Sequence, residues 1–316
     1  MRLIRGRINL PSSLYGAIVT IGNFDGLHRG HQALVQRTLT LAAERGKPSM
    51  MLTFEPMPRE VIQPANPPPR LSSFRERWRA LEHGRLDALC VMRFTPLLRN
   101  LDADGFVSLL HDKLHVSGVV VGHDFKFSRG GDATALDLAR MGLTRGFDVS
   151  VLDPVTVDGL RVSSSDIRSA LAAGDLARAA RMLGRPYAMR GRVVQGQHLG
   201  RTLGYPTANL RLERRRTPLA GIFAVRVHGI RHNGQALPTR DGVASLGTRP
   251  TVDGVGMLLE AHVFDFDGDL YGQELEVEFV ARLRDELRFD DLDALVVQMH
   301  RDAAAARAIL ANPVSG

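Results

Sequence analysis

The pattern of apolar residues changes near Pro186, and this change predicts two domains of different construction. Before it, continuous apolar runs alternate with stretches of helical periodicity, as in parallel strands covered by helices on both faces. The expected strands are 17–22, 49–54, 87–94, 116–122 and 148–152, and the expected helices are 31–45, 73–84, 102–114, 133–144, 164–173 and 175–183. After it, short segments such as 275–283 alternate apolar and polar residues, which is typical of half-buried antiparallel strands. We therefore expect a Rossmann-like, doubly wound α/β domain over residues 1–184, then an antiparallel β domain over 185–316, a barrel or a sandwich, with a final helix near 290–306.

Length and composition agree with two ordinary globular domains. The chain has 316 residues, 44% of them hydrophobic and 24% charged, which is more chain than one hydrophobic core normally serves. Its one cysteine, Cys90, excludes a disulfide framework and fits a reducing compartment. The N-terminal residues lack the apolar stretch of a signal peptide, and no run approaches the ~18 apolar residues of a membrane span. We expect a cytoplasmic protein with no membrane partner.

The basic charge of the chain comes almost entirely from arginine. The net charge is +7, and lysine occurs only at Lys47, Lys113 and Lys126. A protein that binds nucleic acid gathers basic and aromatic residues on one surface, whereas these arginines are scattered and aromatic residues make up only 6%. We therefore expect no nucleic-acid partner, and a basic nucleic-acid-binding protein remains as the non-catalytic alternative.

The first informative motif is Gly22-Asn23-Phe24-Asp25-Gly26-Leu27-His28-Arg29-Gly30-His31, between the first expected strand and helix. Open α/β sheets bind ligands at the carboxyl ends of their strands, and the free N–H groups of a helix N-terminus suit phosphate. Because His28 and His31 straddle the helix start, both imidazoles can face one anion and stabilise the charge that develops in nucleotidyl transfer. Histidines at this spacing also serve as ordinary turn and cap residues. A zinc site would need further ligands, and the other histidines are distant in the sequence.

A second glycine-rich motif, Gly196-Gln197-His198-Leu199-Gly200-Arg201-Thr202-Leu203-Gly204-Tyr205-Pro206-Thr207-Ala208-Asn209, follows an expected strand of the second domain. Its glycines indicate either a loop that wraps closely around a ligand or a flexible hairpin. Thr207 and Asn209 share a face if the segment is extended, so their oxygen atoms could both bind a hard cation such as Mg²⁺.

The first motif resembles the adenylyltransferase half of bacterial bifunctional riboflavin kinase/FMN adenylyltransferases (FAD synthetases), which belong to the HxGH nucleotidyltransferase superfamily. Further stretches are similar to that family's T-F-x-P-H-P-R, G-x-D-F-x-F and S-S-T-x-I-R patterns, namely Thr53–Arg59, Gly122–Phe127 and Ser163–Arg168. The resemblance implies that ATP is bound by Gly22, Asn23, Phe24, Asp25, Gly26, His28, His31, Ser164, Ser165 and Arg168. It implies a flavin side formed by Pro56, Pro58, Asp124 and Phe125. Of these residues, His28, His31 and Arg168 are implied to be catalytic.

Two positions on the expected flavin side depart from the family pattern. Met57 stands where the family usually has histidine, and Ser128 stands where it usually has glycine, before a loop that is about two residues shorter here. Ordinary loop variation is the simpler interpretation of these differences. They also leave open an alternative in which the chain is a riboflavin kinase with an impaired adenylyltransferase half.

The second motif closely resembles the riboflavin kinase signature G-x-x-x-G-R-x-x-G-x-P-T-A-N. The similarity continues in Leu246–Thr251, Glu260–His262, Asp269–Gly272 and Arg284–Phe289. It implies ATP binding by Gly196, Gly200, Arg201, Gly204, Pro206, Thr207 and Asn209, with Mg²⁺ on Thr207 and Asn209. It implies flavin binding by Arg284, Glu286 and Phe289. By resemblance Glu260 is the general base that takes the proton of the ribityl 5′-hydroxyl; without the resemblance, a strand carboxylate facing water is the simpler interpretation.

Together the two resemblances imply an enzyme that uses ATP and Mg²⁺ in both reactions. A C-terminal β-barrel domain would phosphorylate riboflavin to FMN, and the N-terminal α/β domain would transfer AMP to FMN, giving FAD and pyrophosphate. Riboflavin, FMN and ATP are the expected small-molecule partners, and the sequence does not indicate an oligomeric state. A further alternative is an HxGH adenylyltransferase for another mononucleotide, against which the kinase-like second half counts.

Overall fold

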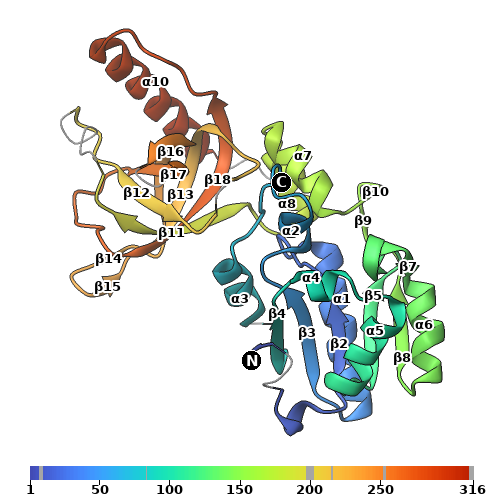
Figure 1. Cartoon of the computed structure of the whole chain (residues 1–316). Coiled ribbons are helices and arrows are strands. Elements are labelled where there is room, and N and C mark those ends of the chain that lie inside the picture. The colour runs from blue at the N-terminus through green and yellow to red at the C-terminus, as the bar shows by residue number, and fades with distance from the viewer. Residues whose placement is uncertain (7–9, 83, 197–202, 215, 252–253, 313–316) are drawn as a thin grey trace. The chain divides into compact units, whose positions relative to one another are not determined.

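The computed structural model describes residues 1–6, 10–82, 84–196, 203–214, 216–251 and 254–312 (Figure 1). The chain forms two compact units: unit 1 comprises Met1–Pro68 and Phe74–Ser163, and unit 2 comprises Pro69–Ser73 and Ser164–Gly316. This division differs from the expected boundary between residues 184 and 185, because helices α7 (Ser164–Ala172) and α8 (Leu176–Leu183) belong to the compact unit that contains the barrel. The boundary between the functional domains stays a prediction.

Unit 1 is built on a six-stranded parallel sheet in the order β1-β4-β3-β2-β5-β8. The strands are β1 (Arg2–Arg5), β2 (Ile18–Ile21), β3 (Ser49–Phe54), β4 (Ala88–Met92), β5 (Gly118–Gly122) and β8 (Asp148–Leu152). From β2 the chain winds through β3 and β4 in one direction and through β5 and β8 in the other, so the doubly wound prediction is confirmed. The edge strand β1 was not predicted, because only its Ile4 side chain is buried and the segment resembles a polar terminus.

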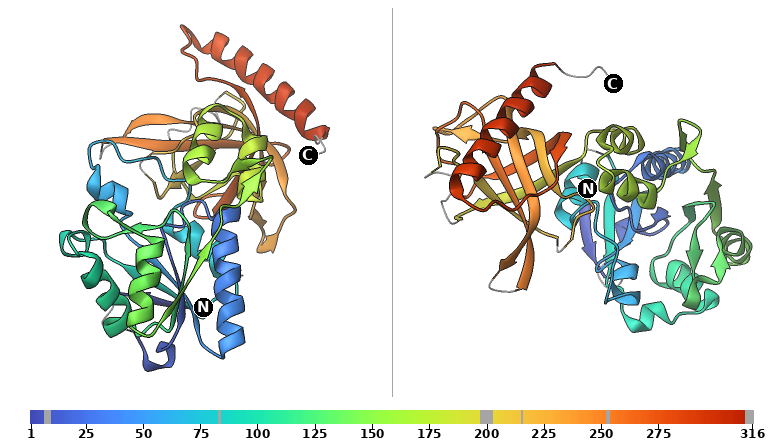
Figure 2. Two further views of the ribbon diagram at one scale, coloured as in Figure 1. Left: turned by 90° about the vertical axis from the view of Figure 1, so that its right-hand side faces the viewer. Right: turned by 90° about the horizontal axis from the view of Figure 1, so that it is seen from above.

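Helices cover both faces of this sheet, because successive strand residues point to opposite sides. Met51 packs with residues of α1 (Arg29–Arg45) and α3 (Phe74–Glu82), whereas Met50 packs on the other face with α5 (Ala103–Ser108) and α6 (Ala135–Thr144). In the left view of Figure 2, α1 in blue and α6 in green lie on opposite sides of the sheet. The smaller elements of unit 1 are η2 (Ser12–Leu14), α2 (Pro58–Ile62), α4 (Pro96–Arg99), the π-helical turn η3 (Leu109–Lys113), η4 (Arg129–Gly131), and the short strands β6 (Lys126–Phe127), β7 (Ala133–Thr134), β9 (Thr156–Val157) and β10 (Leu160–Arg161).

Unit 2 contains a closed antiparallel barrel in the order β11-β12-β17-β16-β13-β18, which decides between the barrel and the sandwich. The strands are β11 (Ala188–Val194), β12 (Ala208–Leu212), β13 (Gly221–His228), β16 (Arg240–Thr251), β17 (Gly254–Val263) and β18 (Glu274–Arg284), and a hairpin is formed by β14 (Arg231–His232) and β15 (Gln235–Ala236). Strand β18 shows the predicted alternation, with Leu275, Val277 and Phe279 buried. Irregular pairing of β13 with β18 accompanies closure, since bulges increase the bend of a sheet.

The predicted final helix is α10, which runs from Leu292 to Ala311 and is longer than expected. It packs on the outside of the barrel (Figure 1). There Ala303, Ala306 and Leu310 bury apolar surface with Ala224 and Phe264. These apolar side chains recur at helical spacing, so one face of α10 packs on the barrel. This places the N-terminal half of α10 beside the mouth of the barrel cavity described below.

Candidate active sites

The glycine-rich turn of unit 1 follows β2, whose neighbours in the sheet are β3 and β5. This is the position at which the sheet order reverses, and the crevice at the carboxyl end of such a strand is the usual ligand site of doubly wound sheets. Gly26 has φ +81°, which favours glycine. Phe24 is buried in the core beneath α1 and α3, so the turn is fixed to the body of the unit.

The two predicted histidines are in contact at the start of α1. His28 is the N-cap, and its Nδ1 atom accepts a hydrogen bond from the backbone N–H of His31 at 3.3 Å. Neutral His28 therefore carries its proton on Nε2. The two imidazole rings stack with centroids 3.6 Å apart, and Gly30 leaves room for them, since a Cβ atom there would lie 3.2 Å from the His28 ring. His28 therefore caps helix α1 and stacks on His31 at the same time, so the capping role does not exclude a role for the two histidines as a pair.

Burial sets the charge state of His31. The pKa of His31 is lowered well below its ordinary value, mainly because burial disfavours the charged form and further because His28 and Arg77 lie nearby. His31 is therefore neutral at pH 7. Its Nδ1 atom is buried and has no hydrogen-bond partner among the residues that the structure describes. Buried polar atoms normally have a hydrogen-bond partner, so a bound ligand or a water molecule is the expected partner of this nitrogen atom.

Arg77 on α3 lies against the glycine-rich turn, and no motif of the sequence pointed to it. Its side chain is 3% exposed. One terminal nitrogen donates to the Asn23 carbonyl oxygen at 2.7 Å, and the other pairs with the Glu55 carboxylate at 2.6 Å. Arg77 thereby joins the turn after β2 to the segment after β3. The sequence did contain one indication of a special role: Arg77 lies on the apolar face of the helix, next to Trp78 and one turn before Leu81.

The predicted flavin-binding residues of unit 1 lie in two loops. Pro56 and Pro58 lie where β3 leads into α2, with Met57 between them and 7% exposed. Asp124 forms an ion pair with Arg161, and Phe125 packs against the core. Their contact with a flavin stays a prediction.

Ser128, which replaces the usual glycine of the resembling family, has φ +70° and ψ 173°. Essentially only glycine adopts this region freely, and another residue there costs about 1–3 kcal/mol. The Oγ atom of Ser128 accepts a hydrogen bond from the backbone N–H of Ala133 at 3.4 Å. The chain therefore keeps a backbone conformation typical of glycine at this position without having glycine.

The remaining predicted ATP ligands of the first domain lie on α7, in unit 2. Ser164 and Ser165 form its first turn, and Arg168 follows one turn later. The Nε atom of Arg168 donates to the Pro69 carbonyl oxygen at 2.7 Å. The role of these three residues toward ATP stays a prediction.

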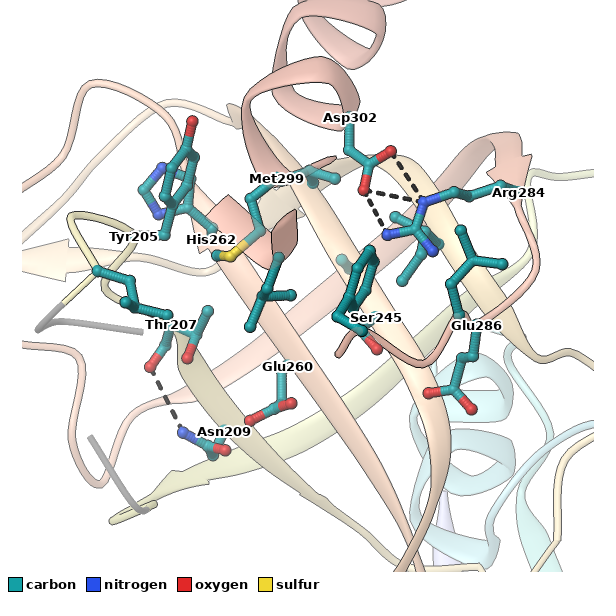
Figure 3. Close-up of a pocket in the computed structure, with 17 residues that line it drawn as sticks. Tyr205, Thr207, Asn209, Ser245, Glu260, His262, Arg284, Glu286, Met299 and Asp302 are labelled. Carbon is teal, nitrogen blue, oxygen red and sulfur yellow. Dashed lines mark hydrogen bonds and ion pairs between the residues drawn. The ribbon is translucent and has the colours of Figure 1, made fainter. Parts of the chain in front are cut away.

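In unit 2, a cavity of about 270 Å³ lies between the barrel and α10 (Figure 3). The predicted kinase residues that line it are Thr207, Asn209, Glu260, Arg284, Glu286 and Phe289. They come from three separate motifs of the sequence. The structure therefore brings together the predicted metal, base and flavin positions of the second domain.

Strand register explains how Glu260 reaches the glycine-rich motif. Asn209 on β12 pairs with Glu260 on β17, which in turn pairs with Ser245 on β16. Directly opposed side chains on neighbouring antiparallel strands are about 4.5–5.5 Å apart. Asn209 is 8% exposed, and its amide nitrogen donates to the Thr207 carbonyl oxygen at 3.5 Å (Figure 3). One row of the barrel thus carries a carboxylate, an amide and a hydroxyl group.

The structure describes two of the three predicted glycines of the second motif, Gly196 and Gly204. A Cβ atom on Gly196 would lie 2.4 Å from the Asn209 amide nitrogen, so the close approach of that side chain requires glycine. Gly204 has φ +81°. Gly200 and Arg201 lie outside the described residues.

A second cavity, of about 400 Å³, borders the same loop and is lined by Pro206 and by the segment from Phe266 to Tyr271. Thr207 lines both cavities. Pro206 is held by His262, whose Nδ1 atom donates to its carbonyl oxygen at 2.8 Å. Thr207 therefore lies where a ligand of one cavity would meet a ligand of the other.

Asp302 on α10 also lines the first cavity, although no motif of the sequence contains it. Its carboxylate pairs with the Arg284 guanidinium, at 2.6 Å from Nη2 and 3.0 Å from Nε (Figure 3). The Nη1 atom of Arg284 donates to the Asp285 carbonyl oxygen at 2.8 Å. Arg284 therefore lines the cavity with its guanidinium held by protein groups. The sequence indicated α10 only as a closing helix.

The oxygen atoms around Asn209 fit a hard cation. Thr207, Asn209 and Glu260 offer hydroxyl, amide and carboxylate oxygen, and Mg²⁺ at phosphate-transfer sites is bound by one or two protein groups together with phosphate and water. Within the described ranges, no cluster of three or more His, Cys, Asp or Glu side chains has the geometry of a metal site. The donor set suits a cation that arrives with a nucleotide.

Comparison with known proteins identifies both regions of the chain. The family model described as FAD synthetase matches residues 10–166, and the one described as riboflavin kinase matches residues 183–310. The chain is 47% identical to the bifunctional riboflavin kinase/FMN adenylyltransferase of Pseudomonas fluorescens over 98% of either chain. It is 42% identical to the protein of the same name from Escherichia coli K12, over 97% of either chain.

One solved structure is similar over nearly the whole chain. It is described as a macrolide-efflux protein from Streptococcus pneumoniae, with 30% identity, a TM-score of 0.81, and coverage of 97% of this chain and 99% of that one. In the part of this chain that the structure describes, no helix is long and apolar enough to cross a membrane. The identity and the TM-score of this structural match support the fold described above.

We predict that Arg77→Met destabilises the protein and raises the pKa of His31. The substitution leaves the Asn23 carbonyl and the Glu55 carboxylate without this donor, which costs about 2 kcal/mol of unfolding free energy. It also removes a positive neighbour, so the pKa of His31 moves toward its ordinary value of about 6.5. Chemical denaturation measures the first effect, and NMR titration of the imidazole protons measures the second.

Arg75→Met on the exposed face of the same helix is the matched control for Arg77→Met, and it should leave the pKa of His31 nearly unchanged, because Arg75 is not among the groups that shift it. An unchanged His31 pKa in a folded Arg77→Met protein would show that this guanidinium does not set the charge state of His31.

Proposed function

Because the chain belongs to the family of bifunctional riboflavin kinase/FMN adenylyltransferases, we propose which of its residues serve each of the two reactions. The enzyme phosphorylates riboflavin with ATP to give FMN, and it adenylylates FMN with a second ATP to give FAD and pyrophosphate. The FAD synthetase region performs the adenylylation and the riboflavin kinase region performs the phosphorylation. ATP, Mg²⁺ and flavins are its substrates, cofactor and products. We further propose that it acts in the cytoplasm.

The observation that carries the kinase assignment is the convergence of Thr207, Asn209 and Glu260 at the wall of one cavity. We place the flavin ring toward Arg284, Glu286 and Phe289, and the ribityl chain toward Glu260. Glu260 then accepts the proton of the 5′-hydroxyl as that oxygen attacks the γ-phosphorus of ATP and ADP leaves.

The nucleotide occupies the second cavity in this proposal, because Thr207 is common to both cavities. The γ-phosphate would then lie at Thr207, facing the ribityl end of the flavin. Mg²⁺ held by Thr207 and Asn209 would neutralise phosphate charge when bound. The main contribution of the chain is to align the two substrates, as is usual in phosphoryl transfer.

For adenylyl transfer, we propose that His28 and His31 donate N–H groups to the phosphates of ATP. A phosphate oxygen of FMN attacks the α-phosphorus, and pyrophosphate leaves. The His28 proton lies on Nε2 because Nδ1 accepts from the backbone. The negative charge of ATP favours the protonated form of His31 and so opposes the effect of burial on its pKa. Charge that develops at the phosphates then meets preorganised donors.

The other residues of the adenylylation reaction keep the roles that the resemblance implies. The turn Gly22–Gly26 and the α7 residues Ser164, Ser165 and Arg168 bind ATP, and the loops with Pro56, Pro58, Asp124 and Phe125 contact the flavin. The alternative of an impaired adenylyltransferase half rests on Met57, on Ser128 and on the shortened loop that follows Ser128. The conformation of Ser128 supports an active enzyme, because the backbone stays in the region of the usual glycine.

We predict that single substitutions separate the two reactions. With riboflavin, ATP and Mg²⁺, the wild-type protein should form FMN and then FAD. His31→Ala should accumulate FMN, because it lacks a phosphate donor, and Asn209→Ala should lower FMN formation from riboflavin by roughly 100-fold through loss of alignment. Chromatography of the flavins measures both. If the wild-type protein makes no FAD from supplied FMN, the two-reaction assignment is wrong.

A second prediction concerns Gly196. In Gly196→Ala the new methyl group displaces the Asn209 amide, since the two would otherwise lie within 2.4–2.8 Å of each other. Phosphorylation of riboflavin should fall at least 10-fold, while FMN adenylylation is retained. Gly234→Ala, in the β14–β15 hairpin, is the control for lost stability, because φ +78° at Gly234 strains an alanine while the added Cβ meets nothing within 4 Å; it should lower stability but keep nearly full kinase activity. Normal kinase activity in Gly196→Ala would mean that Asn209 does not need its observed position.

A further inference from the structure

A short segment of the N-terminal half, Pro69–Ser73, belongs to unit 2, although the chain on either side of it belongs to unit 1. Leu71, Ser72 and Ser73 are buried, with at most 6% of each side chain exposed. The segment forms neither helix nor strand. Its buried carbonyl groups therefore need hydrogen-bond donors from elsewhere in the unit.

Side chains of unit 2 supply these donors. The Tyr187 hydroxyl donates to the Leu71 carbonyl oxygen at 3.1 Å, and Arg214 donates to the same oxygen at 3.0 Å. Arg214 also donates to the Tyr187 hydroxyl at 3.2 Å. Two residues earlier, the Pro69 carbonyl oxygen accepts from Arg168 at 2.7 Å. The segment is therefore held at both carbonyls by buried or half-buried side chains.

Tyr187 and Arg214 are part of the barrel framework. Tyr187 directly precedes β11 and is 4% exposed, and Arg214 follows β12 and is 7% exposed. The backbone carbonyl of Tyr187 also accepts from Phe279 on β18 at 2.9 Å. A buried guanidinium is costly unless it is hydrogen-bonded. The Leu71 carbonyl and the Tyr187 hydroxyl both accept hydrogen bonds from Arg214, and so they stabilise its buried charge. Neither residue lines the two barrel cavities.

We propose that Tyr187 and Arg214, two residues of the riboflavin kinase region, are positioning residues for the adenylyl transfer reaction. They fix the segment Pro69–Ser73, and the Pro69 carbonyl in turn fixes the guanidinium of Arg168. A hydrogen bond at Nε sets the plane of a guanidinium, and that plane decides how its terminal nitrogens meet phosphate oxygens. This inference rests on the proposed role of Arg168 in holding the ATP phosphates.

The experiment measures both reactions separately in the full-length protein, with FMN and ATP for one and riboflavin and ATP for the other. Tyr187→Phe removes one hydroxyl group, and Arg214→Met removes the cation at similar length. We expect each to lower kcat/KM for ATP in adenylylation by roughly 10- to 100-fold, since small misplacements of a phosphate ligand have effects of this size. The kinase kcat/KM should stay within about twofold and serves as the internal measure of a folded barrel.

Three further variants make the outcome decisive. Arg211→Met, at an exposed position on β12, should change neither reaction. Arg214→Lys, which keeps a donor, should recover part of the adenylylation lost in Arg214→Met. Arg168→Met tests the premise, and it should lower adenylylation at least as much as the other variants.

The possible results are distinguishable. If Arg168→Met lowers adenylylation but Tyr187→Phe and Arg214→Met do not, the positioning role is wrong and the proposed function stands. Equal losses in both reactions for Tyr187→Phe and Arg214→Met would also overturn it, because they indicate a general structural role. If Arg168→Met keeps full adenylylation, the role of Arg168 fails and the inference fails with it.

Discussion

The register between β12 and β17 is the constraint on which the proposed kinase site depends. It pairs Asn209 with Glu260, and the next register, between β17 and β16, adds Ser245 to the same row. A slip of one residue would turn the whole row to the opposite face of the barrel wall. The register is held by buried neighbours such as Leu210 and Leu259, which are fully buried and directly paired. Packing of the barrel core therefore places the groups that we propose to act on the substrates.

In the α/β unit, too, buried residues fix the position of the proposed site residues. Strand β2 is buried on both faces, and its carboxyl end leads directly into the turn that presents His28 and His31. The buried anchor is Phe24, and Arg77 joins this turn to the chain after β3. In both units the groups proposed to take part in catalysis lie at places that the backbone and the core hold fixed. This suits reactions in which alignment and fixed charge do most of the catalysis.

Local patterns predicted much of this molecule. Five of the six strands of the sheet, the two glycine-rich motifs and the final helix follow from periodicity and from Gly and Pro positions, and the resemblance added the residues that gather around Glu260. Residues whose role arises only from contacts between distant segments were missed. Arg77, Tyr187, Arg214 and Asp302 carry no motif of their own, and each is defined by a partner at least 18 positions away. The division of the compact units before α7, and the place of Pro69–Ser73 in unit 2, also could not be predicted, because both depend on contacts between segments far apart in the sequence.

The central claim is that one chain transfers two different phosphorus atoms of ATP to the same flavin. It is tested most directly with riboflavin, Mg²⁺ and ATP labelled at either the γ- or the α-phosphate, followed by separation of the flavins. The account predicts that the γ-label appears in FMN and is retained in FAD, and that the α-label appears only in FAD. FAD without the α-label, or FMN without the γ-label, would contradict it.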